Sequence, residues 1–360
     1  MADKPIQGEK RVFMTGNEVV AWAALAAQAD IMYGYPITPQ NEIMHYWTRM
    51  APKFGKRFLQ TEDELSAGFT TLGGVLAGRR AFTATAGPGN TLMQEPMSMA
   101  EMMRIPSVVV IQQRGGPSTA TVIYSQQEVT MTAYGGNGEG FRIVYSTGTH
   151  QELFDYTIKA FNTAWKYRFP TFVLGDGYQA KMRESLTIYD PQDKGMEMVK
   201  TEAFIGKEPV NGIKEPNHIR NTYNTEEELF DVLAKYMEDY LKIAPEIVEY
   251  QEFDCDDADL VVVSHGVVSR AAKGAVQELR SEGYKVGYFR PITLRPFPAE
   301  QLRAVADKTK TLLLVESAYG QMAKLVKDAI FGSTVAIENL FKPGVGITSE
   351  EVVDKVKGLL

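Results

Sequence analysis

Short apolar stretches alternate with longer stretches of helical periodicity through the first half of the chain. The short stretches have the length of buried strands, and the longer ones repeat apolar positions every three or four residues, as a helix does. The expected strands are residues 29–34, 57–60, 81–86, 107–113, 141–145 and 171–174. The expected helices are residues 17–27, 40–47, 62–77, 91–103 and 151–167. Such alternation predicts a parallel sheet with right-handed crossovers.

The pattern changes after residue 186 and then resumes. Residues 187–257 are rich in charges and prolines, apart from an amphipathic helix at 226–241 with Thr225 and Glu228 spaced as a capping box. Strands are expected again at 260–264, 286–289 and 311–315, with helices at 268–281, 299–306 and 321–330. We therefore expect an α/β domain over residues 1–186, a connecting segment over 187–257 and a smaller α/β domain over 258–360.

The loops that follow the first strands should gather at one edge of the sheet, where open parallel sheets bind their ligands. They comprise residues 35–39, 61–64, 87–90, 114–119 and 175–177. The first of them, Tyr-Pro-Ile-Thr-Pro, is stiffened by two prolines and holds the Thr38 hydroxyl at the end of a strand. Taken alone, a proline-punctuated turn is the simpler interpretation.

Composition and charge narrow the class of protein. A net charge of −7 and a pI near 5.4 do not indicate the basic surface that is typical of nucleic-acid-binding proteins. The single cysteine, Cys255, excludes a disulfide framework and any multi-cysteine zinc or iron–sulfur site within this chain, and it suits a reducing cytosol. The sequence has neither a signal-peptide pattern nor a stretch long enough to span a membrane. We expect a cytoplasmic location.

Two charged side chains in the gathered loops are candidates for chemistry. Glu64 at the sheet edge suits proton exchange with a bound ring nitrogen, although Thr61 and Glu64 also have the spacing of a capping box. Arg114 could grip a carboxylate in bidentate fashion, although a surface ion pair is equally consistent with the sequence.

Two further features argue against a metal site on this chain. Gly175-Asp176-Gly177 resembles the start of the thiamine-diphosphate metal motif, but the asparagine expected about 25–30 residues later is missing, and the next is Asn211. We interpret this match as a turn. The four histidines are too scattered to form a metal site with one another.

Several motifs together carry a family resemblance. Residues 34–39 (Gly-Tyr-Pro-Ile-Thr-Pro), 62–64 (Glu-Asp-Glu), 87–89 (Gly-Pro-Gly), 114–119 (Arg-Gly-Gly-Pro-Ser-Thr) and 289–298 (Phe-Arg-Pro-Ile-Thr-Leu-Arg-Pro-Phe-Pro) occur in the order seen in one family. By these motifs the chain resembles the alpha subunit of the 2-oxoacid:ferredoxin oxidoreductases, over nearly its whole length except residues 187–257.

The resemblance implies an enzyme that uses thiamine diphosphate to cleave a 2-oxoacid, passes the acyl group to coenzyme A and sends electrons to ferredoxin. It implies a pyrimidine-type domain followed by a transketolase-C-like domain. A partner beta subunit would supply the diphosphate site, Mg²⁺ and a 4Fe-4S cluster, and gamma and delta subunits could join the complex. No nucleic acid or membrane partner is implied.

The resemblance also assigns roles to single residues. Glu64 would hydrogen-bond the aminopyrimidine ring and promote the imino tautomer that deprotonates the thiazolium carbon. Pro36 and Ile37 would contact the cofactor, and Thr38 and Arg114 would hold the substrate carboxylate.

The substrate stays open at this stage. Gln40 and Asn41, which follow the first motif, resemble the branched-chain 2-oxoacid enzymes, whereas residues 115–119 look more like the 2-oxoglutarate enzymes. Aromatic 2-oxoacids are a further option. Two alternative functions also stay open, a non-catalytic scaffold or regulatory subunit and a transketolase-class thiamine enzyme without electron transfer.

Overall fold

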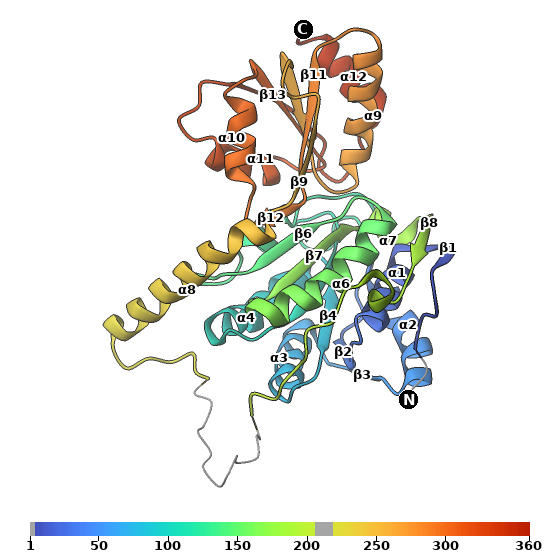
Figure 1. Ribbon diagram of the computed structural model, residues 1–360, viewed down its shortest axis with the longest axis vertical. Helices are drawn as coiled ribbons and strands as arrows, with labels where there is room; N and C mark the ends of the chain where they lie inside the picture. The colour runs from blue at the N-terminus through green and yellow to red at the C-terminus, as the bar shows by residue number, and fades with distance from the viewer. Residues whose placement is uncertain (1–3, 206–218) are drawn as a thin grey trace.

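A computed structural model describes residues 4–205 and 219–360 of the chain, which form two α/β lobes (Figure 1). The expected α/β architecture is confirmed in both lobes. Asn211 and His218, and the middle of the expected connecting segment, lie outside the described residues. The domain boundaries expected from the sequence stay a prediction.

The larger lobe is built on a seven-stranded sheet with the order β12-β6-β7-β5-β4-β2-β3. All its neighbouring strands run parallel except β12, which is antiparallel to β6. The strands are β2 (Ile31–Gly34), β3 (Arg57–Gln60), β4 (Ala81–Thr85), β5 (Val108–Gln113), β6 (Ile143–Ser146), β7 (Thr171–Asp176) and β12 (Thr293–Arg295). Strands β4 and β5 are buried along their whole length, as central parallel strands are.

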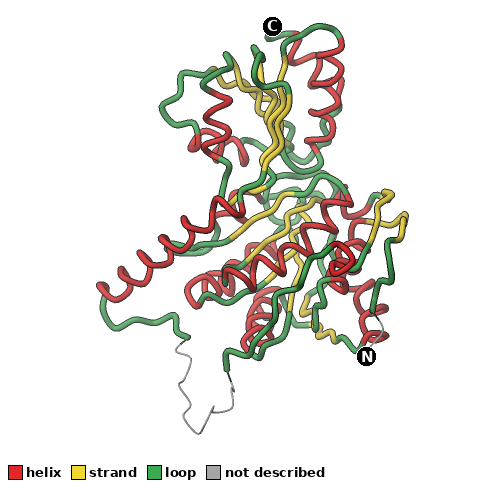
Figure 2. The backbone as a smooth tube through the Cα atoms, in the orientation of Figure 1, coloured by secondary structure: helices red, strands yellow, loops and turns green. Residues whose placement is uncertain are grey.

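Helices cover both faces of this sheet (Figure 2). One hydrophobic cluster contains residues of α1 (Gly16–Ala26), α2 (Asn41–Met50) and α6 (His150–Tyr167). A second cluster contains residues of α3 (Glu64–Leu76), α4 (Pro88–Met103) and α5 (Val129–Tyr134). Because each parallel strand passes into a loop at its carboxyl end, these loops lie at one edge of the sheet.

An antiparallel ribbon joins β1 (Lys10–Thr15) to β8 (Arg183–Ile188) beside the larger sheet. The sequence predicted neither strand, because the apolar stretch of β1 is only three residues long (residues 12–14), and β8 contains only two apolar residues, Leu186 and Ile188. Thr15, at the end of β1, caps α1 by accepting a hydrogen bond from the Glu18 backbone N–H.

The smaller lobe has a five-stranded sheet with the order β14-β13-β10-β11-β9. Its strands are β9 (Tyr250–Phe253), β10 (Leu260–Val263), β11 (Val286–Pro291), β13 (Thr311–Glu316) and β14 (Ala336–Phe341). Its helices are α9 (Val268–Ser281), α10 (Ala299–Ala306), α11 (Gln321–Ala329) and α12 (Ser349–Lys357). The sequence did not predict β9, β14 or α12, since edge strands with polar residues and a short terminal helix give weak periodic signals.

A long helix, α8 (Glu226–Ile247), runs from the junction of the lobes along the larger lobe (Figure 1). Thr225 caps it by accepting from the Glu228 N–H, as expected. The second hydrogen bond of the expected capping box, from the Thr225 backbone N–H to the Glu228 side chain, was predicted wrongly. The Glu228 carboxylate accepts from Arg220 and from the Asn224 N–H instead.

Buried polar groups fix the two lobes against each other. Arg290 of β11 donates to both carboxylate oxygens of Glu152 on α6, at 2.8 and 2.6 Å. Between the lobes, the Gln126 side chain donates to the His265 carbonyl and accepts from the Ser317 N–H. His265 is fully buried, and burial beside Arg290 lowers its pKa to about 3, so its ring is neutral at physiological pH. This junction is therefore a specific, desolvated contact.

Candidate active site

The loops after β2 and β5 meet through Arg114, the residue that follows β5. One Nη atom of Arg114 donates to the Thr38 carbonyl oxygen at 2.8 Å, and the other donates to the Thr119 carbonyl oxygen at 2.5 Å. The structure therefore places Arg114 beside the Tyr35–Pro39 loop, as the gathering of strand ends predicts. The surface ion pair considered for Arg114 is wrong, because its side chain is buried and forms no such pair within the described chain.

Two amide side chains hold the Tyr35–Pro39 loop by donating hydrogen bonds to its carbonyl oxygens. Gln40 is fully buried and donates to the Tyr35 carbonyl oxygen at 2.9 Å, while Asn17 of α1 donates to the Pro39 carbonyl oxygen at 2.7 Å. The peptide bond between Thr38 and Pro39 is cis. These contacts leave the outer surface of the loop free, and Pro36 and Thr38 are exposed there.

Glu64 lies at the same edge and does not serve as a helix cap. The capping-box alternative for Glu64 is wrong, because Asp63 caps α3 by accepting from the Ser66 N–H at 2.6 Å. Glu64 is the first residue of α3 and is only 5% exposed. Burial raises the pKa of its carboxyl group, against smaller lowering effects from its own backbone N–H and from Arg114. No other residue of the described chain forms a hydrogen bond to the Glu64 carboxylate, so this group is available to a ligand.

Two glycines of the Gly87–Gly89 turn allow this arrangement. A Cβ atom added at Gly89 would lie 2.4 Å from Oε1 of Glu64 and 2.2 Å from the Thr85 hydroxyl. A Cβ atom added at Gly87, which has a positive φ of 54°, would lie 2.7 Å from the Arg114 side chain. The glycines thus let Glu64, Thr85 and Arg114 approach one loop closely.

Glu128, which the sequence analysis missed, binds these loops together. One of its carboxylate oxygens accepts from the backbone N–H groups of Gly87 and Arg114, at 2.8 and 2.9 Å. The other oxygen accepts from the Asn90 amide at 3.0 Å. Glu128 is buried in a loop without periodicity, so nothing in the sequence pattern distinguishes it from a surface acid.

The arrangement fits the aminopyrimidine end of thiamine diphosphate. Glu64 offers an uncommitted carboxyl group, and the nearby buried Thr85 hydroxyl and Arg114 Nε have no partner in the described chain. By contrast, residues 4–205 and 219–360 contain no group of three or more His, Cys, Asp or Glu side chains placed to hold a metal ion. Glu64, Thr85 and Arg114 therefore offer hydrogen-bonding groups that suit a polar heterocycle.

Gly175-Asp176-Gly177 is not a simple turn, which corrects the sequence interpretation. Asp176 ends β7 and caps the short helix α7 (Gly177–Lys181) by accepting from the Gln179 N–H at 2.8 Å. Burial raises the pKa of Asp176 to about 7. One oxygen of its carboxylate is thus used within the fold, as the cap of α7.

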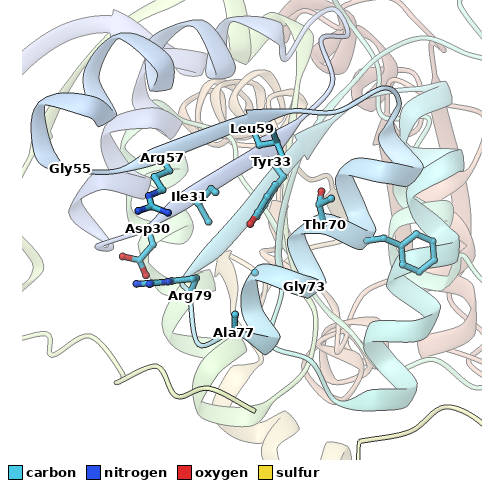
Figure 3. Close-up of a pocket in the computed structure, with 12 residues that line it drawn as sticks. Asp30, Ile31, Tyr33, Gly55, Arg57, Leu59, Thr70, Gly73, Ala77 and Arg79 are labelled. Carbon is cyan, nitrogen blue, oxygen red and sulfur yellow. The ribbon is translucent and has the colours of Figure 1, made fainter. Parts of the chain in front are cut away.

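A groove of about 730 Å³ lies away from these loops (Figure 3). Its lining includes Asp30, Ile31 and Arg57 at the amino ends of β2 and β3, and Arg79 beyond α3. It includes neither Glu64 nor Arg114. The candidate site is therefore defined by converging side chains at the carboxyl ends of the strands, and this groove is separate from it.

The sequence matches two protein-family descriptions along most of its length. The thiamine-diphosphate-binding domain of pyruvate flavodoxin/ferredoxin oxidoreductases matches residues 22–252. Core domain II of pyruvate:ferredoxin oxidoreductase matches residues 258–352.

Two curated relatives from Methanothermobacter marburgensis are equally similar. Ketoisovalerate oxidoreductase subunit VorB is 35% identical, covering 87% of this chain and 88% of the relative. The 2-oxoglutarate synthase subunit KorA is 35% identical, covering 96% of this chain and 98% of the relative.

Solved structures agree with these matches. A 2-oxoglutarate:ferredoxin oxidoreductase from Magnetococcus marinus superposes with a TM-score of 0.86 at 26% identity, over 97% of this chain. The chain spans 65% of the length of that solved chain. A split-gene transketolase has a TM-score of 0.58 at 12% identity, which shows likeness of fold alone. No helix in the described part of the chain has the length and apolar character needed to cross a membrane.

Proposed function

The chain belongs to the 2-oxoacid:ferredoxin oxidoreductase family, and we propose that it is the alpha subunit of a complex that oxidises a 2-oxoacid to an acyl-coenzyme A. The observation that carries the proposal is the uncommitted Glu64 carboxyl group beside Arg114 and the Tyr35–Pro39 loop. Thiamine diphosphate, when bound, supplies a carbon nucleophile and an electron sink for the loss of carbon dioxide.

Glu64 is the proposed acid–base group. Its carboxyl group would hydrogen-bond a ring nitrogen of the aminopyrimidine and exchange a proton with it. Burial raises the pKa of Glu64, which brings it closer to neutral pH, where proton exchange in both directions is efficient. Pro36 and Ile37 would form the apolar contact beside the ring.

Arg114 and Thr38 are the proposed substrate-binding residues. Guanidinium carries five N–H groups, and two of those in Arg114 are used by the Thr38 and Thr119 carbonyls. The remaining N–H groups, including the unpartnered Nε–H, could donate to a substrate carboxylate. The exposed Thr38 hydroxyl would add a second donor, so that the acid is oriented before its carboxylate leaves.

A partner beta subunit is proposed to complete the site. The described residues hold no metal-binding cluster, and Cys255 is the only cysteine of the sequence. Mg²⁺, the diphosphate site and the 4Fe-4S cluster would then belong to the partner, with ferredoxin as electron acceptor. We propose a cytoplasmic complex, in which gamma and delta subunits could also take part.

The proposed substrate is 2-oxoglutarate or a branched-chain 2-oxoacid. Relatives named for each of these two activities are equally similar to the chain, at 35% identity. Arg114 would recognise the carboxylate that all 2-oxoacids share, so the choice between them rests on residues around the substrate's other end.

The test is to co-purify the native complex and assay it on a panel of 2-oxoacids with coenzyme A and a viologen dye. We expect dye reduction by the native complex and a large loss of turnover in Glu64→Gln. Glu62→Gln is the matched control and should change turnover little, because the Glu62 side chain is exposed. Full turnover by Glu64→Gln would refute the role of Glu64. A complex that binds its partners but oxidises no 2-oxoacid would instead favour the scaffold function.

A further inference from the structure

Arg142, the residue before β6, is a fully buried cation whose side chain is fixed on every side. Its Nε and one Nη atom donate to the two carboxylate oxygens of Glu101, at 2.6 and 2.8 Å. The same Nη atom also donates to the Gly135 carbonyl oxygen at 2.9 Å. The other Nη atom donates to the Thr132 carbonyl oxygen and to the side-chain oxygen of Gln94, at 3.2 and 2.8 Å. All five N–H groups of the guanidinium are used, so this side chain cannot turn.

Three residues of α4 form a buried polar stripe that leads from Arg142 to the candidate site. Asn90, Gln94 and Glu101 are separated by four and seven residues, which are spacings that repeat on one face of a helix. Each of the three is at most 8% exposed. Because α4 begins directly after Gly87, the first member of the stripe lies at the candidate site, and the last lies against Arg142.

Hydrogen bonds that all run in one direction connect Arg142 to Glu128 along this stripe. A guanidinium has no acceptor, so the Gln94 amide turns its oxygen toward Arg142 and its NH₂ group toward Asn90. That NH₂ group donates to the side-chain oxygen of Asn90 at 2.8 Å. The Asn90 NH₂ group therefore faces Glu128, and it donates to one carboxylate oxygen at 3.0 Å. Each amide in this chain of hydrogen bonds is thus oriented by the residue before it.

The chain of hydrogen bonds ends on the backbone of the candidate site. The second carboxylate oxygen of Glu128 accepts from the Gly87 and Arg114 N–H groups, at 2.8 and 2.9 Å. A carboxylate has acceptors only, so the side chain that meets its first oxygen must be a donor. Asn90 is such a donor because Gln94 occupies its oxygen. These side chains are buried, so bulk water does not replace a lost partner.

We infer that Arg142, Gln94 and Asn90 are positioning residues for the candidate site. They act through Glu128, whose carboxylate they orient so that it holds two backbone N–H groups of the site. The inference about the backbone stands on the contacts described above. Its consequence for substrate binding rests on the proposed function of Arg114.

The test reverses the direction of the hydrogen bonds. In Gln94→Glu, the new side chain still accepts from Arg142 but has no N–H group to offer to Asn90. The Asn90 amide would then turn over and present its oxygen to Glu128, and two acceptors would face each other. We expect the backbone N–H groups of Gly87 and Arg114 to exchange with deuterium about tenfold faster in the full chain, as measured by mass spectrometry.

A second substitution should restore the hydrogen bonds in the reversed direction. When Glu128→Gln is added to Gln94→Glu, the new amide at position 128 would donate to the turned Asn90 oxygen. Its own oxygen would again accept from the two backbone N–H groups. We expect the double variant to return their exchange to within about twofold of the wild-type rate, although each single variant speeds it. Unchanged exchange in Gln94→Glu, or a double variant that exchanges as fast as the single variants, would overturn the inference.

Two controls separate orientation from a general loss of stability. Ser98→Ala lies one turn further along α4, and the Ser98 hydroxyl donates to the Gln94 backbone carbonyl oxygen, so exchange at the site should not change. The amides of β10 in the smaller lobe are the internal reference, because global destabilisation would speed their exchange as well. If Gln94→Glu alone does not fold, the double variant should recover the fold, and failure of both to fold would overturn the inference.

Turnover of the reconstituted complex connects these residues to the proposed function. Gln94→Glu should raise KM for the 2-oxoacid several-fold and by more than it lowers kcat, because the Arg114 backbone moves while Glu64 stays in place. The double variant should reverse this change. If exchange follows the expected pattern while KM stays constant, the positioning role stands and the proposed role of Arg114 in substrate binding is wrong.

Discussion

Glu128 offers the sharpest test of how the candidate site is held together. Its two carboxylate oxygens accept three hydrogen bonds, from the Gly87 and Arg114 N–H groups and from the Asn90 amide. In Glu128→Gln, one of these oxygens becomes an NH₂ group that faces a donor. Asn90 cannot rotate its own amide to compensate, because its oxygen accepts from Gln94 and its nitrogen also donates to Thr132.

The magnitude follows from the least damaging orientation of the new side chain. The amide oxygen introduced by Glu128→Gln would stay with the two backbone N–H groups, and the new NH₂ group would oppose the Asn90 amide. One hydrogen bond to a charged group is then lost, and both the Asn90 N–H and the new NH₂ group are left without an acceptor, which costs about 3–5 kcal/mol in total. Burial raises the pKa of Glu128, so removing the charge recovers part of this cost. We therefore expect a net loss near the lower end of this range, about 3 kcal/mol.

The assay combines urea unfolding with turnover of the reconstituted complex. Glu128→Gln should lower the free energy of unfolding by the amount above and reduce turnover, because the Arg114 and Gly87 loops lose their common anchor. Glu128→Ala should lower the free energy further, since it leaves all three donors unsatisfied. Glu95→Gln, on the exposed face of α4, is the control. A loss below about 0.5 kcal/mol for Glu128→Ala would refute the reasoning.

Three more variants probe buried parts of the larger lobe. Gly89→Ala should displace Glu64 and abolish turnover, because the new Cβ would overlap the Glu64 carboxylate. Circular dichroism should show that the fold is retained. If turnover is also retained, the Glu64 side chain has room to move. Glu101→Gln should lower the free energy of unfolding by about 3–5 kcal/mol in urea titrations. The reason is that the buried Arg142 would lose the carboxylate that binds it through two hydrogen bonds. A loss no larger than that of the exposed Glu95→Gln control would contradict this. Asp176 has a folded-state pKa of about 7, raised from 3.8, so its contribution to stability is full below about pH 4 and is lost as pH rises through about 7. Asp176→Asn should therefore flatten the fall of thermal stability over that pH range, and an unchanged slope would count against the raised pKa.

The sequence predicted the parts of the fold that depend on local periodicity. The buried strands β4, β5 and β7 and the long helices α3 and α6 follow from apolar stretches and three-to-four-residue repeats. The ribbon of β1 and β8 could not be predicted in this way, because its pairing joins residues far apart in the chain. The same holds for β12, whose three residues take strand form only through contact with β6.

The candidate site was predictable only where a loop follows a strand. Thr38, Glu64 and Arg114 follow or approach strand ends, so the parallel topology alone brings them together. Glu128 lies in a loop whose path depends on tertiary contacts, and its sequence neighbours are ordinary polar residues. The conformation of the Arg114 side chain was likewise beyond the sequence, because the carbonyl oxygens it binds belong to two different loops.

The placement of β12 has a consequence for how this protein can be divided. Residues 293–295 follow β9, β10 and β11 of the smaller lobe in the chain. They nevertheless form an edge of the larger sheet by pairing with β6. A fragment that stops near residue 257 would expose the hydrogen-bonding edge of β6, a fully buried strand, and such edges invite aggregation. The larger lobe is therefore a poor candidate for expression as a separate fragment. The full chain is better expressed as one unit.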